Sequence, residues 1–261
     1  MIKLLVLFLV LFFIFCNLAD ATIGKRHVFN QLQLANFLSA PLNLSTHLGT
    51  PIWLQNELYL NDGLILNPTS KHFPNIEKLR LHLPMLMKES QNCVENSKPI
   101  NKDMYFEGIA DDGWKRFYIK WYGPSDKLAK QICPETCKLL DTMPEVHLAM
   151  FSILMPGSVI RPHFGPARMS LRYHMGISTP NDDECNIKIG ERTYSWRDGK
   201  DVMFDDTMIH SVRNNTTKPR IILFLDIERP QEGFFKSITK KQIQYLGPMT
   251  TRANNKKENV S

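Results

Sequence analysis

The fold is decided between Ser158 and Glu228, where the chain reads SVIRPHFGPARMSLRYHMGISTPNDDECNIKIGERTYSWRDGKDVMFDDTMIHSVRNNTTKPRIILFLDIE. Runs of β-branched and aromatic residues recur at short intervals, separated by clusters of Gly, Pro, Asn and Asp, which is typical of strands joined by turns. The expected strands are Ser158–Arg161, Ser170–Ile177, Asn186–Ile189, Arg192–Trp196, Asp201–Phe204, His210–Asn214 and Arg220–Glu228. No helix long enough for a parallel crossover interrupts them, so we expect a mainly β fold of the jelly-roll type.

Further strands and helices are expected before this stretch. Trp114–Tyr122 and His147–Met155 are rich in aromatic and aliphatic residues and favour strands. Asn75–Lys88 has apolar residues at helical spacing, and Pro84 should bend or interrupt that helix. Pro134–Leu140 is expected to form a short helix, because proline suits a first helical turn.

Length and charge restrict the class of protein. The chain has 261 residues, of which 43% are hydrophobic, which suits one catalytic domain with a short appendage. The net charge of +6 favours an anionic partner such as nucleic acid, phospholipid or a phosphorylated glycolipid, although solubility explains it equally well. We expect no nucleic-acid partner, because no helix-turn-helix, zinc-finger or RNA-binding motif is visible. Lys115, Arg116 and Lys120 lie in an aromatic strand, which either faces an anionic substrate or has an ordinary solvated face.

The cysteines do not indicate a disulfide framework. There are five of them, an odd and sparse set: Cys16, Cys93, Cys133, Cys137 and Cys185. Cys133 and Cys137 lie one helical turn apart, but no second Cys or His pair has matching spacing for a zinc site. We expect structural thiols in a reducing compartment.

The amino-terminal segment is apolar without interruption from Leu4 to Cys16. It is either a cleaved signal peptide, with Ala19-Asp-Ala21 as the cleavage site, or an uncleaved membrane helix. We favour the membrane helix. The apolar residues between Leu42 and Leu54 either lie along a bilayer surface or pack on the domain.

The chain divides into four expected parts. Residues 1–21 are the membrane anchor or signal sequence, and residues 22–100 are an extension of helices and loops. The catalytic jelly roll covers residues 101–230. Residues 231–261 carry an amphipathic helix, Ser237–Leu246, and a basic tail.

Two histidines are candidate metal ligands. His163 and His210 each lie at the edge of an expected strand, so the rim of a jelly roll could bring them together. Two histidines and a carboxylate on one face of Fe(II) leave positions open for a co-substrate and O₂. The carboxylate usually follows the first histidine by two residues, but that position is Gly165. This chain therefore lacks the usual third ligand.

Four further residues predict a site for a dicarboxylate beside the metal. Arg220 begins an apolar strand and offers a planar fork for a carboxylate. Arg172 and His174 are two residues apart on one strand and point to the same face. Ser152 could donate a hydroxyl hydrogen bond.

These residues resemble those of the aspartyl/asparaginyl β-hydroxylase family of Fe(II)- and 2-oxoglutarate-dependent dioxygenases. The match runs through Pro156-Gly157, Pro162-His-Phe-Gly-Pro166, Leu171-Arg-Tyr-His174, Phe204-Asp-Asp206, His210, Arg220 and Asp226. Within that family the chain is most similar to the bacterial lipid A acyl-chain hydroxylases. The strings that carry this likeness are Gly113–Gly123, Ser170–His174, Thr179–Asp183, Tyr194–Gly199, Arg220–Phe224 and Asp226–Pro230.

The resemblance implies a cupin-like double-stranded β-helix that holds Fe(II) through His163 and His210, with 2-oxoglutarate and O₂ as co-substrates. Arg220 would pair with the distal carboxylate of 2-oxoglutarate, and its pocket would be completed by Ser152, Arg172 and His174. The peptide-hydroxylase branch is known for a two-histidine centre with water in place of the carboxylate. Asp205 and Asp206 are interpreted as supporting residues, with Asp206 as an iron ligand the alternative.

Three functions remain open from sequence. The first is hydroxylation of a fatty acyl chain of lipid A, or a related acylated glycolipid, by an enzyme anchored in the inner membrane with its catalytic domain on the cytoplasmic side. The second is hydroxylation of aspartyl or asparaginyl side chains of a protein, against which the lack of a helical repeat before the domain argues. The third is a non-catalytic binding protein with a decayed metal site. No obligate protein partner is evident.

Overall fold

The computed structural model describes residues 45–99, 109–110, 112–165, 168–241 and 243–244. The expected membrane helix at Leu4–Cys16 and the basic tail lie outside these residues. Among the helices that the structure describes, none combines the length and the apolar character needed to cross a bilayer.

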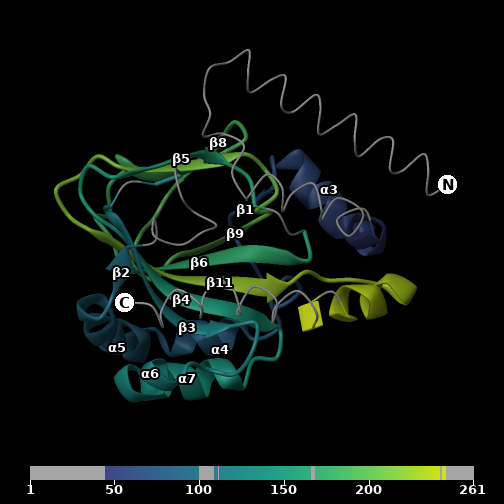
Figure 1. Ribbon diagram of the computed structural model, residues 1–261. Coiled ribbons are helices and arrows are strands. Elements are labelled where there is room, and N and C mark those ends of the chain that lie inside the picture. The colour runs from purple at the N-terminus through teal and green to yellow at the C-terminus, as the bar shows by residue number, and fades with distance from the viewer. Residues whose placement is uncertain (1–44, 100–108, 111, 166–167, 242, 245–261) are drawn as a thin grey trace, which may run out of the picture.

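Two antiparallel sheets form the framework (Figure 1). The larger sheet has the strand order β1 (Leu64–Ile65), β9 (Asp201–Phe204), β6 (Ser170–Ser178), β11 (Arg220–Glu228), β4 (Val146–Leu154), β3 (Trp114–Trp121) and β2 (Lys98–Pro99). The smaller sheet has the order β5 (Val159–His163), β10 (His210–Asn214), β7 (Cys185–Ile189) and β8 (Arg192–Ser195). The strands β4 to β11 are divided between two facing sheets, as in a jelly roll, so the expected mainly β architecture is confirmed.

Alternation along β11 separates two cores. Ile221, Leu223, Leu225 and Ile227 face the helical side of the larger sheet. Ile222 and Phe224 lie in a second cluster with residues of the smaller sheet, such as Ile187 and Ile189. Because successive strand residues point to opposite faces, Arg220 and Asp226 share the inner face with Ile222 and Phe224. The polar residues of β11 therefore lie between the two sheets.

Helices cover the outer face of the larger sheet, as the lower part of Figure 1 shows. They are α4 (Ile76–Leu81), α5 (Leu83–Glu95), α6 (Lys127–Ile132) and α7 (Pro134–Asp141). The expected interruption near Pro84 is a break at His82, and Pro84 lies in the first turn of α5, where it removes no helical hydrogen bond. A further helix, α3 (Ile52–Leu60), packs beside β1, and residues 233–241 are helical after β11.

Two segments outside the expected jelly roll take part in the larger sheet. Strands β1 and β2 both come from the 22–100 region, and they form its two edges. Strand β1 pairs with β9 through Leu64 and Phe204. Since β9 leads directly to the loop before His210, the amino-terminal region supports the loop that carries a candidate ligand.

The strand β3 does not present all of its basic residues to a substrate. Lys120 is buried, and its ammonium lies 4.0 Å from the carboxylate of Asp141 at the end of α7. Burial lowers the pKa of Lys120, which Asp141 partly offsets. Lys120 therefore faces the helical layer and cannot meet a lipid phosphate, contrary to the functional interpretation of this strand.

The described cysteines are free thiols. Cys93, Cys133, Cys137 and Cys185 are all buried and form no disulfide. The structural role expected for them agrees with this placement.

Candidate active site

His163 and His210 lie side by side. They face each other across the antiparallel pairing of β5 and β10, and their ring centroids are 4.2 Å apart. Each ring bonds through Nδ1 to the carbonyl oxygen two residues before it, at 2.7 Å to Arg161 and 2.8 Å to Met208. Because a carbonyl only accepts, Nδ1 carries the hydrogen and Nε2 keeps its lone pair, the arrangement that metal-binding histidines use.

Both imidazoles are neutral near pH 7. Burial lowers the pKa of His163 to about 4, and neighbouring His210 adds to the effect. Burial also lowers the pKa of His210 to about 4, with a further contribution from Arg172. Neutral imidazole is the form that binds a metal, so the pair is ready to bind at physiological pH.

The space beside Gly165 is filled by Asp206. A Cβ placed on Gly165 would lie 1.6 Å from Oδ2 of Asp206, well inside contact distance. The Gly165 N–H donates to the Asp206 carbonyl at 2.7 Å, which fixes the two segments together. A carboxylate from another loop thus occupies the place where a side chain at position 165 would project. A side chain at position 165 would force the Asp206 carboxylate to move.

Asp206 lies beside the two histidines but is not placed to act with them as a third metal ligand in the described structure. Its Oδ1 is 3.5 Å from Nε2 of His210, and its Oδ2 accepts from Arg172 at 3.0 Å. Within the described residues no group of three His, Cys, Asp or Glu side chains is arranged to hold a metal. Within the described residues, His163 and His210 would hold a metal through two nitrogen atoms, and the Asp206 carboxylate lies beside them.

Arg172 connects Asp206 to a second buried carboxylate. Its Nε donates to Oδ1 of Asp226 at 2.7 Å, and its guanidinium lies 4.1 Å from the ring centroid of Phe224. The hydroxyl of Tyr122 donates to the other oxygen of Asp226 at 3.1 Å. Burial raises the pKa of Asp226, and Arg172 opposes that shift. Arg172 is thus held by two carboxylates on the inner face of the larger sheet.

Arg220 is a buried cation without a counter-ion in the described structure. It is 1% exposed, and neither Nε nor one terminal nitrogen has a hydrogen-bond partner. Its nearest aromatic support is Trp196, whose ring centroid is 4.7 Å from the guanidinium carbon. Burial lowers the pKa of Arg220 to about 10. A buried guanidinium of this kind requires an anion, and a carboxylate matches its fork.

His174 is a second buried polar side chain without hydrogen-bond partners in the described structure. Neither of its ring nitrogens has a hydrogen-bond partner, and the ring is enclosed by Trp196, Phe204 and Phe224. Burial lowers its pKa well below the usual value, with contributions from Arg220 and Arg172. These free nitrogens fit a polar ligand that reaches from the histidine pair toward Arg220.

Ser152 completes the pocket from β4. It is buried, and its hydroxyl accepts from the indole N–H of Trp114 at 2.9 Å, which leaves the hydroxyl hydrogen to donate. Ser152 pairs with Ile222 and Leu154 pairs with Arg220, so Ser152 is the diagonal neighbour of Arg220 on the inner face.

The structure places the six predicted site residues in one region. His163 and His210 form the pair at the end of the barrel, whereas Ser152, Arg172, His174 and Arg220 line the inner face of the larger sheet. The sequence predicted Asp206 as a supporting residue, with iron ligand as the alternative, but it did not predict that its carboxylate fills the space beside Gly165, and it gave no role to Trp196 or Tyr122. Gly165 itself was the available signal, because a glycine at a ligand position indicates that another group takes that space.

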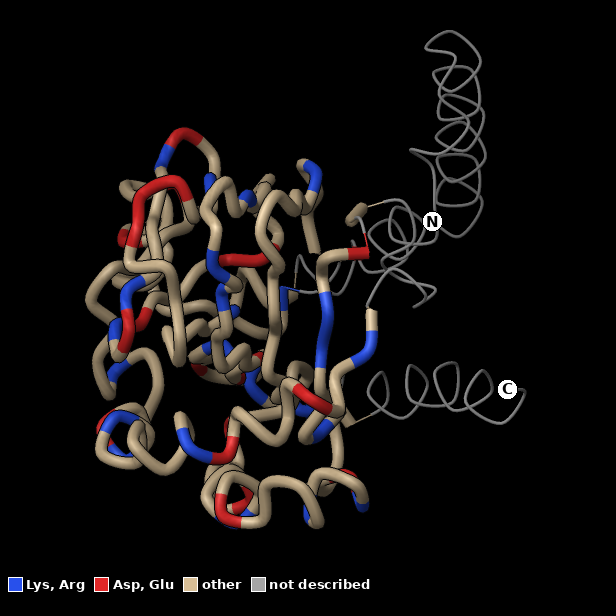
Figure 2. The backbone as a smooth tube through the Cα atoms, turned by 90° about the vertical axis from the view of Figure 1, so that its left-hand side faces the viewer, with Lys and Arg blue, Asp and Glu red and all other residues tan. Residues whose placement is uncertain are grey.

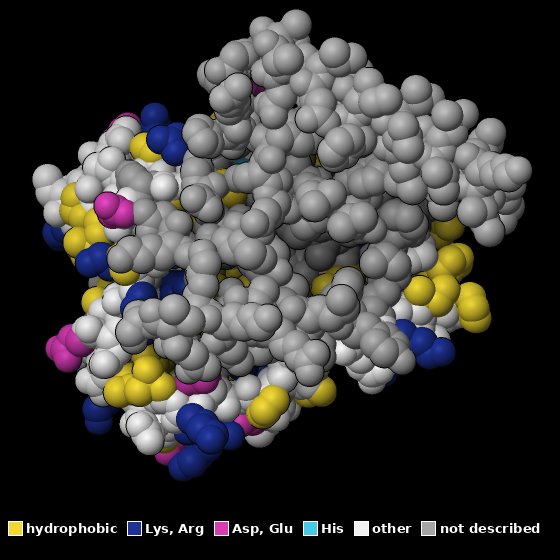
Figure 3. All heavy atoms as spheres, viewed as in Figure 1, with side chains coloured by type: hydrophobic (Ala, Val, Ile, Leu, Met, Phe, Trp, Pro, Cys, Tyr) yellow, Lys and Arg dark blue, Asp and Glu magenta, His cyan; other side chains and the backbone are white. Residues whose placement is uncertain are grey.

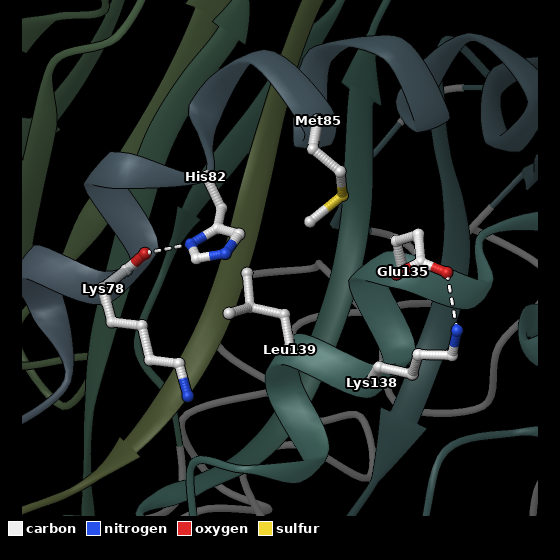
Figure 4. A pocket seen from close by; sticks show the side chains of 6 residues that line it. All are labelled: Lys78, His82, Met85, Glu135, Lys138 and Leu139. Atoms are coloured by element: carbon white, nitrogen blue, oxygen red, sulfur yellow. Dashed lines mark hydrogen bonds and ion pairs between the residues drawn. The ribbon is translucent and has the colours of Figure 1, made fainter.

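A groove elsewhere on the molecule carries no comparable chemistry. It lies between α4, α5 and α7, and Figure 4 shows Lys78, His82 and Glu135 among its lining residues. Lys78 donates to Thr142 at 2.7 Å, and Lys138 pairs with Glu135 at 2.7 Å. These polar groups are already partnered and exposed.

The family follows from comparison with known sequences. The family described as Aspartyl/Asparaginyl beta-hydroxylase matches residues 75–230, which is more than half of the chain. The chain belongs to the aspartyl/asparaginyl β-hydroxylase family. That match contains all six predicted site residues, and the resemblance expected from sequence is confirmed.

Curated proteins whose names describe a lipid acyl hydroxylase and an aspartyl/asparaginyl hydroxylase are similar to this chain. An ornithine lipid ester-linked acyl 2-hydroxylase from Rhizobium tropici is 34% identical over 46% of this chain and 43% of its own length. The human aspartyl/asparaginyl beta-hydroxylase is 31% identical over 48% of this chain and 17% of its own length. Each alignment therefore spans less than half of the relative. The crystal structure of a Pseudomonas putida prolyl-4-hydroxylase covers 57% of this chain and 88% of its own, with 13% identity and a TM-score of 0.38.

Family membership implies an enzyme that uses Fe(II), 2-oxoglutarate and O₂, and the residues present fit these groups. Two neutral imidazoles keep Nε2 available for iron. The unpartnered nitrogens of Arg220 and His174 fit the carboxylate and oxo groups of 2-oxoglutarate.

Proposed function

We propose that this protein hydroxylates a fatty acyl chain of a membrane lipid, with lipid A as the substrate. The observation that carries the chemistry is the buried, unpaired Arg220 beside a histidine pair whose Nε2 atoms are available. A metal alone would need only the histidines. Arg220, on the inner face of the larger sheet, adds a cation that can bind one carboxylate of a dicarboxylate co-substrate.

Each residue has a defined task in this proposal. His163 and His210 bind iron through Nε2, and the carbonyls of Arg161 and Met208 fix their orientation. Arg220 pairs with the far carboxylate of 2-oxoglutarate, and Ser152 donates to the same group. Bound iron with 2-oxoglutarate and O₂ supplies the oxidation, which yields succinate, CO₂ and the hydroxylated substrate. The aromatic walls around His174 exclude water from this co-substrate.

The mouth of the site favours an apolar substrate. Phe164 and Ile209 directly adjoin the two histidines in sequence, and their side chains are 41% and 51% exposed. An acyl chain would be in contact with such side chains, whereas a peptide aspartate or asparagine would need polar partners for its backbone. The Rhizobium tropici relative is named as an acyl 2-hydroxylase of a lipid, which supports the same choice.

The location is part of the proposal. 2-Oxoglutarate and ferrous iron are supplied in a reducing cytosol, and four described cysteines are free thiols. We therefore place the catalytic domain on the cytoplasmic side of the inner membrane, with Leu4–Cys16 as the anchor. Figure 2 shows acidic and basic positions interspersed along the described backbone, with no long run of basic residues of the kind that would favour a nucleic-acid partner.

The test is mass spectrometry of the lipids of cells with the protein, without it, and with the His163→Ala/His210→Ala variant. The proposal predicts lipid A with one added oxygen on an acyl chain, about 16 daltons, only in cells with the wild-type protein. The added oxygen on ornithine lipid instead would keep the chemistry and change the lipid. The similarity to the human aspartyl/asparaginyl beta-hydroxylase makes a protein substrate the second candidate, and unchanged lipids with hydroxylated aspartate or asparagine would favour it.

A further inference from the structure

Helix α3 carries an apolar face that the rest of the described structure leaves open. Leu54 and Leu58 are buried in the core, and they fix one side of the helix. On the other side Ile52 is 72% exposed, Tyr59 is 86% exposed and Leu60 is 68% exposed. A surface helix normally presents polar residues outward, so its exposed side should be the polar one. In α3 both sides are apolar.

The exposed residues of α3 form a continuous stripe. Ile52, Asn56, Tyr59 and Leu60 fall within roughly 100° of arc at helical spacing, and Asn56 is the one polar residue among them. The stripe contains no acidic side chain. Other exposed apolar side chains are scattered over the described surface, and Figure 3 shows yellow groups at several places on the face that it draws; scattered exposed apolar residues are ordinary. The clustering on one helix is what requires an explanation.

Basic side chains stand at both ends of the stripe. The ammonium of Lys71 lies 3.9 Å from the ring centroid of Trp53, at the start of α3. Arg192 donates to the carbonyl of Leu60 at 3.0 Å, at the end of the helix, where its Nε also lies 3.6 Å from the carboxylate of Asp62. Apolar residues flanked by cations match a bilayer surface, where acyl chains lie below a layer of phosphate groups.

Hydrogen bonds connect the segment after α3 to the loop that precedes His210. Beyond Leu60, the carbonyl of Gly63 accepts from the N–H of Asp205 at 2.9 Å, in the loop that precedes His210. The carbonyl of Ile209 in that loop accepts from Gly190 at 3.0 Å, and Arg192 follows on the next strand. The exposed apolar residues of α3 and those at the mouth therefore belong to connected segments of the surface.

The position of α3 in the chain points to the same partner. The described residues begin at Ser45, and the helical residues 45–49 precede α3, so α3 lies near the start of the described domain, on the amino-terminal side that carries the apolar sequence Leu4–Cys16. Figure 1 shows α3 on the side of the molecule away from α6 and α7. A lipid-bound amino terminus would bring α3, rather than the helical layer, to the bilayer.

We propose that the outward face of α3 docks the enzyme on a phospholipid surface, so that the mouth at Phe164 and Ile209 receives an acyl chain from the bilayer. This inference rests on the proposed acyl-chain substrate and adds how that substrate is reached. Burial of the apolar side chains of Ile52, Tyr59 and Leu60 would hold the helix in the interface. Lys71 and Arg192 would contact phosphate groups at its two ends.

The test measures how close α3 comes to lipid without requiring turnover. A fluorescent nitrobenzoxadiazole group is attached at Tyr59→Cys, or at Leu81→Cys on α4 as the matched control, in the full chain with Cys16→Ser. Leu81 is 79% exposed and apolar, and the remaining cysteines are buried. The vesicles are phosphatidylethanolamine and phosphatidylglycerol with a nitroxide on the acyl chains, which quenches nearby fluorophores.

The inference predicts strong quenching at position 59 and weak quenching at position 81. Equal quenching at both positions would mean that the amino-terminal segment tethers the domain to the membrane without a preferred contact of α3 with lipid, and would overturn the inference. A label at position 59 that is shielded from water but unaffected by the nitroxide would assign the face to the protein itself or to a second copy, and would overturn it equally.

A second measurement separates this inference from the proposed function. The triple variant Ile52→Ser/Tyr59→Ser/Leu60→Ser should lose about tenfold or more of its rate on lipid in vesicles. The reason is that it lacks the three apolar side chains that the bilayer would bury. Its rate on the same lipid dispersed in detergent should be unchanged. If no lipid is hydroxylated in either form, the proposed function fails, while the quenching result still decides the docking face. Equal losses in vesicles and in detergent would contradict docking.

Discussion

Replacement of Arg220 by methionine should stabilise the protein in the absence of 2-oxoglutarate and abolish its response to that co-substrate. The guanidinium is buried with unpartnered nitrogens. Burial lowers the pKa of Arg220 from its usual value to about 10, and a shift of this size corresponds to about 3 kcal/mol of disfavour for the charged form. Replacement of buried charges by apolar side chains stabilises other proteins by about 1 to 4 kcal/mol, which is the same range.

The sign follows from the protonation states. Arginine is charged in both the folded and the unfolded chain at pH 7, so the full penalty of burial is present there and would be relieved only at alkaline pH. Saturating 2-oxoglutarate removes the penalty by supplying a carboxylate. At about one hundred times the dissociation constant, a ligand adds about 2.7 kcal/mol to the free energy of unfolding.

Urea unfolding of both proteins, with and without 2-oxoglutarate and Fe(II) under anaerobic conditions, measures these quantities. The Arg220→Met variant should be more stable than wild type without ligand, and its stability should not change when 2-oxoglutarate is added. Arg213→Met is the matched control, because Arg213 is half exposed on β10 and pairs with Glu184 only at 3.8 Å. It should change stability by no more than about 0.5 kcal/mol and keep the response to ligand. An Arg220→Met protein that is less stable than wild type, or that 2-oxoglutarate still stabilises, would refute the reasoning.

Three further predictions concern the residues around the pocket. Gly165→Ala should lower the free energy of unfolding by about 1 to 3 kcal/mol, because its Cβ overlaps the Asp206 carboxylate, and Asp206→Ala should relieve most of that loss in a double-mutant cycle; additive effects would show that the two sites do not touch. Arg229→Met should cost about 3 to 5 kcal/mol in urea unfolding, since it strips Asp205 of a buried ion pair of 2.7 Å, and Asp205→Asn in the same chain should recover much of it. His174→Phe should make stability less dependent on pH below about 6.5, by about 1.4 kcal/mol per pH unit, because the unfolded chain takes up a proton there that buried His174 does not; parallel curves for wild type and variant would contradict the low pKa.

The strands of the jelly roll were predictable because alternation and turn residues are local signals. The expected Asp201–Phe204, His210–Asn214 and Arg220–Glu228 are observed with the same limits, as β9, β10 and β11. Pairing was not predictable in the same way. Strand β1 has two residues, too short to give an alternation signal, and its partner β9 lies more than 130 residues further along the chain.

The residue types of the candidate site were predictable from the sequence, but the contacts between them were not. Spacing and residue type identified His163, His210 and Arg220, because metals and carboxylates require particular side chains. The contact between Gly165 and the Asp206 carboxylate could not be predicted, because it depends on where the backbone places Asp206. The burial of Lys120 under α7 was likewise hidden, because alternate residues of a strand face opposite sides and sequence does not say which side is which.

Oxygen incorporation is the most direct test of the central claim, that a two-histidine iron centre with an Arg220 co-substrate pocket hydroxylates an acyl chain. The full chain is incubated in lipid vesicles containing lipid A with Fe(II), 2-oxoglutarate and isotopically labelled dioxygen, and the lipids and succinate are analysed by mass spectrometry. We expect one labelled oxygen on an acyl chain for each succinate formed, and none with His163→Ala/His210→Ala. Succinate formed without labelled lipid, or labelled lipid formed equally well by the double variant, would contradict it.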